Sequence, residues 1–219
     1  MIPFFARNVN IISENTAVRI DIFSIKCYNI LCQHFLQEEF SMDQAHLPSA
    51  PFPYRRIMVI GCPGSGKSTF SRALRDCTGL PLYHLDAIYW REDRTTLQRE
   101  EFRTVLRHIV EADCWIIDGH YASTLEMRIQ ACDAVFFLDY PPEVCIEGVR
   151  ARRGQTRSDI PWVEAEDDSE FLEFIGKFQE ESKPRVLELL EKYPEKPVFR
   201  FSCRTESEEF LRECNFSAK

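Results

Sequence analysis

The chain has 219 residues, of which 44% are hydrophobic and 28% are charged, and it carries a formal net charge of −8. This length suits one α/β domain with room for an appendage, and the composition is typical of a globular protein. An acidic chain lacks the diffuse positive field of proteins that coat nucleic acid or anionic membranes, so we expect neither a nucleic-acid surface nor a membrane contact.

The cysteines and the apolar runs indicate the cellular compartment in which the protein is expected. Nine cysteines are an odd number and include no C-x-x-C pair, which favours a reducing, cytoplasmic location over a disulfide framework or a zinc site. No apolar run is long enough to span a bilayer, and the first residues lack the basic and apolar regions of a secretory signal. The sequence leaves the oligomeric state open.

Residues 1–54 differ from the rest of the chain and are predicted to form an N-terminal extension. Apolar residues recur along 20–35 with a helical spacing, and three prolines within 48–53 indicate a linker. Two explanations are open. One is a docking helix; the other, which we favour, is a start site placed too far upstream, since Met42 and Met58 are in-frame alternatives.

From residue 55 onward, to residue 219, strand-like and helix-like segments alternate in one predicted domain. The strand-like runs are short and apolar and lie at 56–60, 82–85, 114–117, 134–138 and 197–201. The helix-like segments lie at 69–75, 95–111, 142–153, 169–192 with a kink at Pro184, and 205–213. Repeated β-α units predict an α/β fold in three layers, with a parallel sheet between two layers of helices.

Residues 61–68 read Gly-Cys-Pro-Gly-Ser-Gly-Lys-Ser, which matches the phosphate-binding loop (P-loop) pattern G-x-x-x-x-G-K-[ST]. The match lies between a strand and a helix, as its mechanism requires, which disfavours a glycine-rich turn with an accidental lysine. Backbone N–H groups and the helix N-terminus would surround the phosphates of ATP. The predicted nucleotide-binding residues are Gly61, Pro63, Gly64, Ser65, Gly66, Lys67, Ser68 and Thr69.

Within this loop, individual side chains have predicted roles. Lys67 would contact the β- and γ-phosphates, Ser68 would ligate Mg²⁺, and Thr69 would contact the α-phosphate. The predicted cofactors are therefore ATP and Mg²⁺.

Three aspartates directly follow predicted strands: Asp86, Asp118 and Asp139. Ligands of open parallel sheets bind beyond the carboxyl ends of the strands, so these carboxylates are expected near the loop. Four apolar residues directly before Asp118 complete the Walker B pattern, which predicts that Asp118 is a second Mg²⁺ ligand. A functional role is also favoured for Asp86, whereas Asp139 precedes two prolines and is predicted to be a helix cap.

Four arginines lie at 150, 152, 153 and 157, where a predicted helix runs into an irregular segment. A mobile lid that carries arginines can supply positive charge to a transferred phosphoryl group and exclude water. Arginines also favour a solvated helix C-terminus, but this cluster is denser than capping needs. We predict a lid at about 150–168, with Gly154 as its hinge and Arg128 and Arg185 as weaker arginine candidates.

Aromatic residues follow two of the aspartates and predict an acceptor pocket. Tyr89 and Trp90 come after Asp86, and His120 and Tyr121 come after Asp118. Aromatic walls with a few polar tips suit small-molecule sites. Ordinary packing explains Trp90 equally well, and for His120 a hydrogen-bonding role is favoured over general-base catalysis.

The loop at 61–69 resembles that of adenylate kinases, and Ile116-Ile117-Asp118-Gly119 is similar to the Asp-Gly strand end of that family. Over residues 55–212 the chain more closely resembles the adenylate-kinase-like family often labelled "DNA topology modulation protein". This resemblance implies a five-stranded sheet of order 2-3-1-4-5 with a short lid. The shared segments are 56–61, Leu85-Asp86-x-x-Tyr89-Trp90, Trp115-Ile116-Ile117-Asp118-Gly119-x-Tyr121, Phe137-Leu138-Asp139 and Arg152-Arg153-Gly154-x-Thr156-Arg157.

The chain departs from adenylate kinases where these bind AMP. Those enzymes hold the AMP phosphate with two arginines, at positions where this chain has Tyr89 and, near 122, Ala122 and Ser123. Without these bidentate contacts AMP is disfavoured as the acceptor. Asp86 is then similar to the acceptor carboxylate of small-molecule kinases that resemble shikimate or gluconate kinase. The lid holds no cysteine, which disfavours a zinc-bearing lid.

The predicted function is a Mg²⁺-dependent phosphotransferase that moves the γ-phosphate of ATP to a small-molecule or nucleotide acceptor. Lys67, Asp86, Arg153 and Arg157 are the predicted catalytic residues. Two alternatives are open: a nucleotide-dependent switch or ATPase that acts through a protein partner, and an ATP-binding protein without turnover.

Overall fold

The computed structural model describes residues 52–157, 159–160, 162–163 and 168–216. Of residues 215 and 216 it describes the backbone only. Residues 1–51 of the predicted extension, and 158, 161 and 164–167 of the predicted lid, lie outside the described residues. The described elements are β1 (Arg56–Gly61), α2 (Lys67–Thr78), β2 (Leu82–His84), α3 (Leu85–Tyr89), α4 (Arg99–Val110), β3 (Trp115–Asp118), a 3₁₀ turn (Ala122–Thr124), α5 (Leu125–Ala131), β4 (Ala134–Leu138), α6 (Pro142–Ala151), α7 (Ser169–Glu181), α8 (Lys183–Lys192), β5 (Val198–Phe201) and α9 (Arg204–Phe216).

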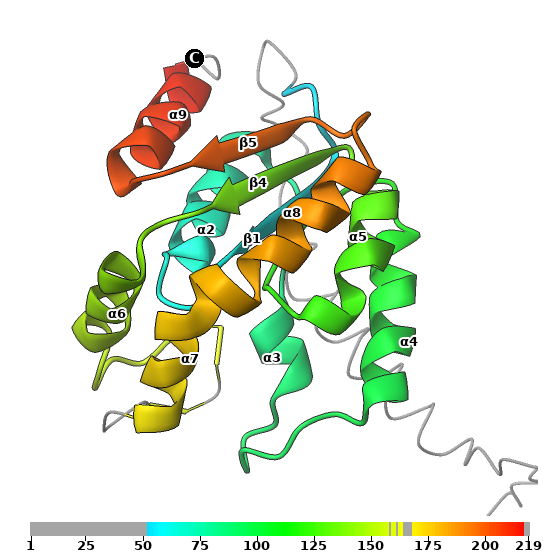
Figure 1. Cartoon of the computed structure of the whole chain (residues 1–219). Helices are drawn as coiled ribbons and strands as arrows, with labels where there is room; N and C mark the ends of the chain where they lie inside the picture. Colours follow the sequence, from blue (N-terminus) through cyan, green and yellow to red (C-terminus); the bar gives the residue numbers. More distant parts are fainter. Residues whose placement is uncertain (1–51, 158, 161, 164–167, 217–219) are drawn as a thin grey trace, which may run out of the picture. The chain divides into compact units, whose positions relative to one another are not determined.

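The five strands form one sheet of order β2-β3-β1-β4-β5, in which every neighbouring pair is parallel. Figure 1 shows β1, β4 and β5 side by side. This confirms the predicted fold class. The register aligns Val59 of β1 and His84 of β2 with Asp118 of β3. The carboxyl ends of these strands therefore meet at one edge, where the loop after β1 also lies.

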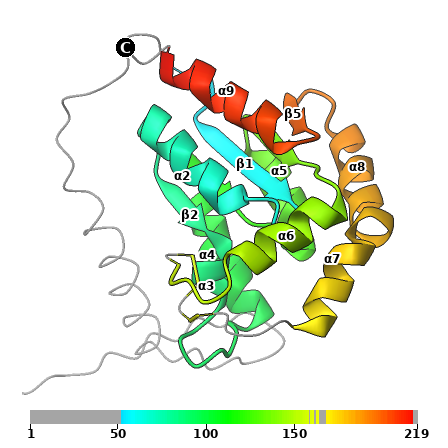
Figure 2. The same ribbon diagram turned by 90° about the vertical axis from the view of Figure 1, so that its left-hand side faces the viewer.

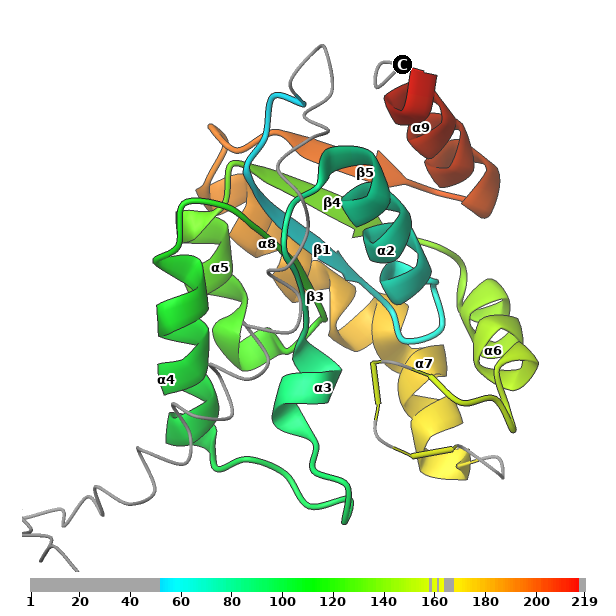
Figure 3. The ribbon, with the colours of Figure 1, turned by 180° about the vertical axis from the view of Figure 1, so that it is seen from behind.

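Helices cover both faces of the sheet. Figure 2 views the sheet with α2 and α9 on one side and α8 on the other, and Figure 3 shows α2 and α9 from behind. β1, β3 and β4 are almost completely buried, because layers of helices cover the central strands on both sides. A cluster of phenylalanines packs between the sheet and α2 and α9, formed by Phe70, Phe136, Phe199, Phe201 and Phe210.

The last residues of the predicted extension pack on this domain. The ring of Phe52 contacts that of Tyr54 edge-on, and Tyr54 contacts Phe199 of β5 at 5.6 Å between centroids. These rings cover the sheet where β1 begins. The division at 54/55 stays a prediction, because residues 1–51 lie outside the described part of the chain.

Three predicted boundaries are wrong for local reasons. The second strand ends at His84, and Leu85 already begins α3, so Asp86 lies in the first turn of a helix. The helix predicted at 95–111 begins only at Arg99, because Gln98 and Glu101 form a capping box there. The segment 169–192 is two helices that meet at Ser182, with Pro184 in the first turn of the second.

Helix α5 was not predicted at all. Only Leu125 and Ile129 supply buried apolar side chains to it, and the third buried residue is Arg128, so its hydrophobic periodicity is weak. Within the described residues, no helix combines the length and the apolar character needed to cross a membrane. The seven cysteines among them form no disulfide.

Candidate active site

The loop between β1 and α2 has a backbone that only glycine allows at its centre. Gly64 has a φ of 83°, and a Cβ on it would lie 2.0 Å from the carbonyl oxygen of Cys145 in α6. A Cβ on Gly148, also in α6, would lie 2.1 Å from the carbonyl oxygen of Gly64. Figure 2 shows α6 beside the start of α2. The loop and α6 thus pack backbone against backbone.

Several polar groups of this loop have unused hydrogen-bonding capacity. Gly66 is the N-cap of α2 and offers no side chain to the first N–H groups of the helix. The Ser65 hydroxyl is buried and has no hydrogen-bond partner among the described residues. The Lys67 amine folds back and donates to the carbonyl oxygen of Cys62 at 2.9 Å. A helix start of this kind is suited to binding an anion.

Asp118, the last residue of β3, combines burial with an unpaired oxygen. Its residue is 4% exposed, and its Oδ2 accepts a hydrogen bond from His84 Nδ1 at 2.8 Å. Its Oδ1 is buried and has no hydrogen-bond partner among the described residues. A buried carboxylate oxygen without a donor is an uncommon and costly arrangement that a cation relieves. Asp118 and the Ser68 hydroxyl are oxygen donors of the kind that Mg²⁺ prefers, so the residues present fit this metal.

Asp86 lies in α3 and interacts with the loop that follows β3. Tyr121 OH donates to Asp86 Oδ1 at 2.7 Å. Burial raises the pKa of Asp86, and the nearby carboxylates of Asp118 and Asp159 add to this, while Tyr121 and Lys67 oppose it. Burial and the Asp86 charge likewise raise the pKa of the Tyr121 phenol, which therefore stays a hydrogen-bond donor. Asp86 is accordingly a stronger base than a solvated aspartate.

Arg128 holds the loop after β3 in place and does not belong to the lid. It is completely buried in α5 and donates to the carbonyl oxygens of Gly119, His120 and Tyr121 at 2.7, 2.5 and 3.2 Å. The weaker prediction that Arg128 is a lid arginine is therefore wrong. Arg128 shares a helical face with Leu125 and Ile129, and this spacing in the sequence could have revealed that Arg128 is buried and structural.

His120 is a neutral side chain at neutral pH. Burial, together with the positive charges of Lys67 and Arg128, lowers its pKa to about 3. Its ring packs against Phe178 with 4.9 Å between the centroids. A base this weak is poorly matched to proton abstraction near pH 7. The favoured hydrogen-bonding role is not seen at Nδ1 either, because this atom is buried and has no hydrogen-bond partner among the described residues.

The lid segment contains an ion pair that the sequence did not predict. Arg157 Nε donates to Asp159 Oδ1 at 2.9 Å, and Arg157 Nη2 donates to Asp159 Oδ2 at 2.6 Å. The two side chains are only 14% and 2% exposed. Burial alone would raise the pKa of Asp159, but the hydrogen bonds of Arg157 and of the Ser68 hydroxyl outweigh it and hold the pKa well below its usual value. Arg157 is thus paired with a carboxylate that also accepts a hydrogen bond from Ser68, the predicted Mg²⁺ ligand.

One cavity of about 1830 Å³ brings most of the predicted site residues together. This volume exceeds the roughly 300–1,000 Å³ typical of a site for one ligand, so it has room for two. Gly61, Ser65 and Asp118 are buried and do not line it. Trp90, His120, Tyr121 and Arg185 also line this cavity. The predicted residues that do are Pro63, Gly64, Gly66, Lys67, Ser68, Thr69, Asp86, Arg153 and Arg157.

Asp139 is not the predicted helix cap. The N-cap of α6 is Pro141, and no side chain caps this helix. Asp139 instead lies between Lys183 Nζ at 2.9 Å and Arg200 Nη2 at 2.5 Å, so it joins β4 to α8 and β5. The prediction failed because both cationic partners lie more than forty residues away in sequence, where no local pattern reveals them.

Comparison with known proteins finds solved structures of low sequence identity and no family. No family model matches the chain, and no curated protein matches it. A shikimate kinase from Bacteroides thetaiotaomicron is 19% identical, with 73% of this chain and 95% of that chain covered and a TM-score of 0.46. Shikimate kinase from Acinetobacter baumannii, in complex with shikimate, is 17% identical over 74% and 90%, with a TM-score of 0.49.

A third solved structure is also similar, at a lower sequence identity. Deoxyadenosine kinase from M. mycoides, with bound dATP, is 14% identical, with 74% of this chain and 99% of that chain covered and a TM-score of 0.43. At these identities the likeness concerns the fold alone. Membership of the "DNA topology modulation" family stays a prediction from the shared segments.

Proposed function

We propose that this protein is an ATP- and Mg²⁺-dependent phosphotransferase with a small-molecule or nucleotide acceptor. The observation that carries the proposal is that Asp86 and the phosphate loop line the same cavity. A donor site alone would suit an ATPase or a switch. A half-buried carboxylate with a raised pKa in the same cavity is the additional group that a hydroxyl acceptor requires.

The donor side would use the loop and the first turn of α2. Backbone N–H groups of 64–68 and the Lys67 amine would bind the β- and γ-phosphates, for which Lys67 would leave the carbonyl oxygen of Cys62. Ser68 and Asp118 would hold Mg²⁺, which neutralises negative charge on the phosphates when it is bound. The Ser65 hydroxyl and Asp118 Oδ1 would gain the partners that they lack among the described residues.

The acceptor side would use Asp86. Its carboxylate would orient the acceptor hydroxyl and take the proton of that hydroxyl as the oxygen attacks the γ-phosphorus. The bond from the γ-phosphorus to the bridging oxygen then breaks, and ADP leaves. Tyr121 holds the carboxylate in position through its 2.7 Å hydrogen bond.

The lid would complete the site. Arg157 is oriented by Asp159, and both side chains line the cavity together with Arg153. Positive charge at this place would stabilise the equatorial oxygens of the phosphoryl group during transfer. Enclosure by the lid would also limit transfer to water.

The test is to incubate the protein with Mg²⁺ and γ-³²P-ATP in the presence of nucleosides, nucleotides and sugar acids. Transfer of label to an acceptor, lost in Asp86→Asn although ATP binding is kept, supports the phosphotransferase. Release of inorganic phosphate at a rate that no acceptor changes would contradict it. That outcome would favour the alternative of a nucleotide-dependent switch or ATPase.

A further inference from the structure

A tight turn after α3 carries an arginine in an unusual backbone conformation. Arg91 N donates to the Thr95 carbonyl oxygen and Arg94 N to the Arg91 carbonyl oxygen, both at 2.9 Å, and Trp90 pairs with Thr96. Arg94 has a φ of 64°, in the left-handed region. Glycine is favoured at such a position, and a residue with a Cβ costs about 1 kcal/mol there. The turn thus holds an arginine where the backbone alone would favour glycine.

The side chain of Arg94 reaches across to the lid. Its guanidinium lies 5.9 Å from the centre of the Trp162 ring, and Trp162 packs edge-on against Trp90 at 5.3 Å. Among the described residues, no acidic side chain forms an ion pair with Arg94. Its positive charge therefore lies against an indole face and is available to an anion.

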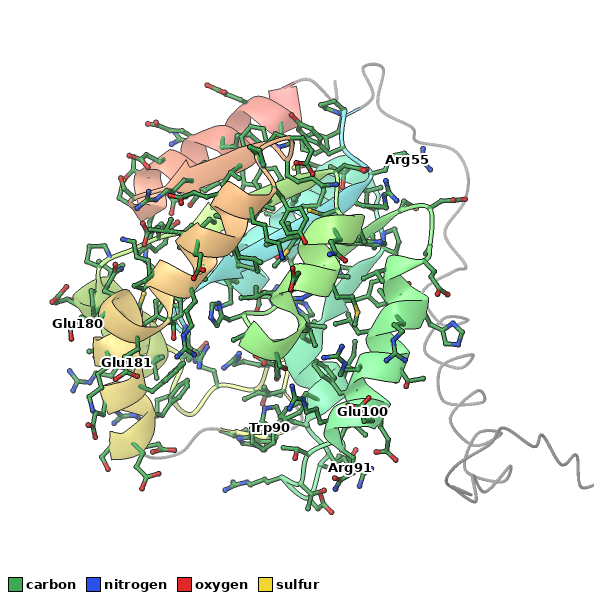
Figure 4. The ribbon with its side chains drawn as sticks, turned by 45° about the vertical axis from the view of Figure 1, so that its right-hand side comes forward. Arg55, Trp90, Arg91, Glu100, Glu180 and Glu181 are labelled. Carbon is green, nitrogen blue, oxygen red and sulfur yellow. The ribbon has the colours of Figure 1, made fainter. Side chains whose placement is uncertain are left out.

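These three side chains line the cavity that also contains Asp86. Trp90 follows Asp86 by one helical turn, since Trp90 N donates to the Asp86 carbonyl oxygen at 3.0 Å. Arg91 differs from Arg94 in this respect: it does not line the cavity and pairs with Glu101 of α4 at 3.8 Å. Figure 4 shows Trp90 below the lid segment and Arg91 on the side of α4.

The position of Arg94 bears on the acceptor. Tyr89, Ala122 and Ser123 leave the acceptor side without arginines at the two places where adenylate kinases have them. The turn at 91–95, which directly follows α3, supplies a cation to this side from Arg94 instead. A guanidinium over an indole offers a positive charge beside a flat aromatic wall, which suits recognition of a carboxylate or a phosphate.

We propose that Arg94 binds an acidic group, a carboxylate or a phosphate, of the acceptor, while Asp86 binds the acceptor hydroxyl and Trp90 and Trp162 cover the molecule between them. The acceptor is thus an acid that carries a hydroxyl. Its role as acceptor rests on the proposed function, whereas the anion site itself does not.

The first experiment measures anion binding without any transfer. The phosphate loop is filled with a non-hydrolysable ATP analogue and Mg²⁺, and tryptophan fluorescence is followed while sulfate replaces chloride at constant ionic strength. We expect a saturable change that Trp162→Phe reduces. Arg94→Gly should weaken sulfate binding about ten-fold or more, and Arg91→Gln should leave it unchanged.

The Arg94→Gly variant separates binding from folding. Glycine relieves the left-handed backbone, so its thermal unfolding temperature should equal or exceed that of the wild type. A wild type without a saturable response to sulfate would overturn the anion site. So would an Arg94→Gly variant that binds sulfate as the wild type does.

The second experiment measures transfer to acceptors in matched pairs that differ in the acidic group: AMP with adenosine, and gluconate with sorbitol. We expect transfer to an acidic member, with kcat/KM reduced about ten-fold or more in Arg94→Gly and unchanged in Arg91→Gln. Transfer to adenosine or sorbitol that does not depend on Arg94 would overturn the proposed acceptor class. Absence of transfer to all four counts against the proposed function, and the sulfate titration then decides on Arg94 by itself.

Discussion

Arg157 and Asp159 form a two-point ion pair within the lid, and their side chains are almost completely buried beside the phosphate loop. The arginine therefore has a fixed direction relative to Ser68. A charge that must stabilise a short-lived transition state benefits from such orientation before the reaction begins.

Asp159→Asn should lower kcat without a comparable effect on ATP binding, because the amide cannot hold the Arg157 guanidinium by two charged acceptors. We expect a loss of about ten-fold or more, as for a hydrogen bond between charged groups. The measurement is kcat and the dissociation constant of ATP in single variants and in the double variant with Arg157→Lys. If Asp159 acts through Arg157, the two losses are not additive; additive losses would contradict a positioning role.

The same ion pair predicts a dependence of stability on pH. The pKa of Asp159 is held below its usual value in the folded protein, so the pair stabilises the fold above the unfolded-state pKa of about 4. This contribution is lost as the pH falls toward the folded-state pKa. Urea unfolding between pH 7 and pH 3 should show a smaller loss of stability in Asp159→Asn than in the wild type; equal losses would rule this out.

Asp86→Asn should reduce phosphate transfer by about 10²- to 10⁴-fold, the usual contribution of a general base. It should also stabilise the fold. The folded-state pKa of Asp86 is raised, so at neutral pH the charged form is disfavoured by folding, and stability rises as the pH falls through that pKa. Thermal unfolding at pH 7 tests this sign, and a lower Tm for Asp86→Asn would contradict the burial argument.

Lys67→Ala should weaken binding of ATP by about 10- to 100-fold, because a hydrogen bond between charged groups contributes about 1.5–3 kcal/mol. Calorimetric titration with ATP and Mg²⁺ measures this. Arg75→Ala is the control, since Arg75 lies in the last turn of α2, pairs with Asp76 at 2.9 Å and does not line the cavity. Unchanged ATP binding in Lys67→Ala would show that the assigned donor site is wrong.

Gly64→Ala should destabilise the fold strongly, because its Cβ would lie 2.0 Å from the carbonyl oxygen of Cys145 and its φ is positive. Gly79→Ala is a matched control. Gly79 also has a positive φ, of 68°, but nothing lies within 4 Å of its Cβ position, so we expect a loss of only about 1 kcal/mol. Urea unfolding compares the two, and equal losses would mean that the contact with α6 is not tight.

The fold and the position of the phosphate-loop sequence could be predicted because both depend on local sequence patterns. Apolar strands alternate with helices, and residues 61–68 are contiguous, so spacing alone indicates the loop between β1 and α2. Asp118 could also be placed, since it ends a buried strand. Helix α3 was not predicted, because five residues are too few to show a helical period. The start of α4 was predicted too early, because the capping box of Gln98 and Glu101 decides where this helix begins.

The residues of the proposed acceptor side were named from the sequence, but the contacts between them could not be predicted in the same way. Asp86 meets Tyr121 across 35 residues, and Trp90 meets Trp162 across the lid. Such pairs depend on how loops fold above the sheet, which periodicity does not describe. The Arg157–Asp159 pair is local, but its importance comes from burial, and the apolar residues that directly follow it, Ile160, Trp162 and Val163, were not used as a sign of burial.

The contact of Gly64 with α6 limits where the molecule can bend. Because Gly64 and Gly148 each leave no space for a Cβ, the phosphate loop and α6 pack tightly against each other, and we expect them to move together. A lid that opens and closes can therefore turn only beyond Ala151, where α6 ends and where Gly154, with a φ of 73° and nothing near its Cβ position, interrupts the arginine-rich segment. In the proposed mechanism the start of the lid would therefore keep its position beside the phosphate loop, and only the segment beyond Gly154 would move.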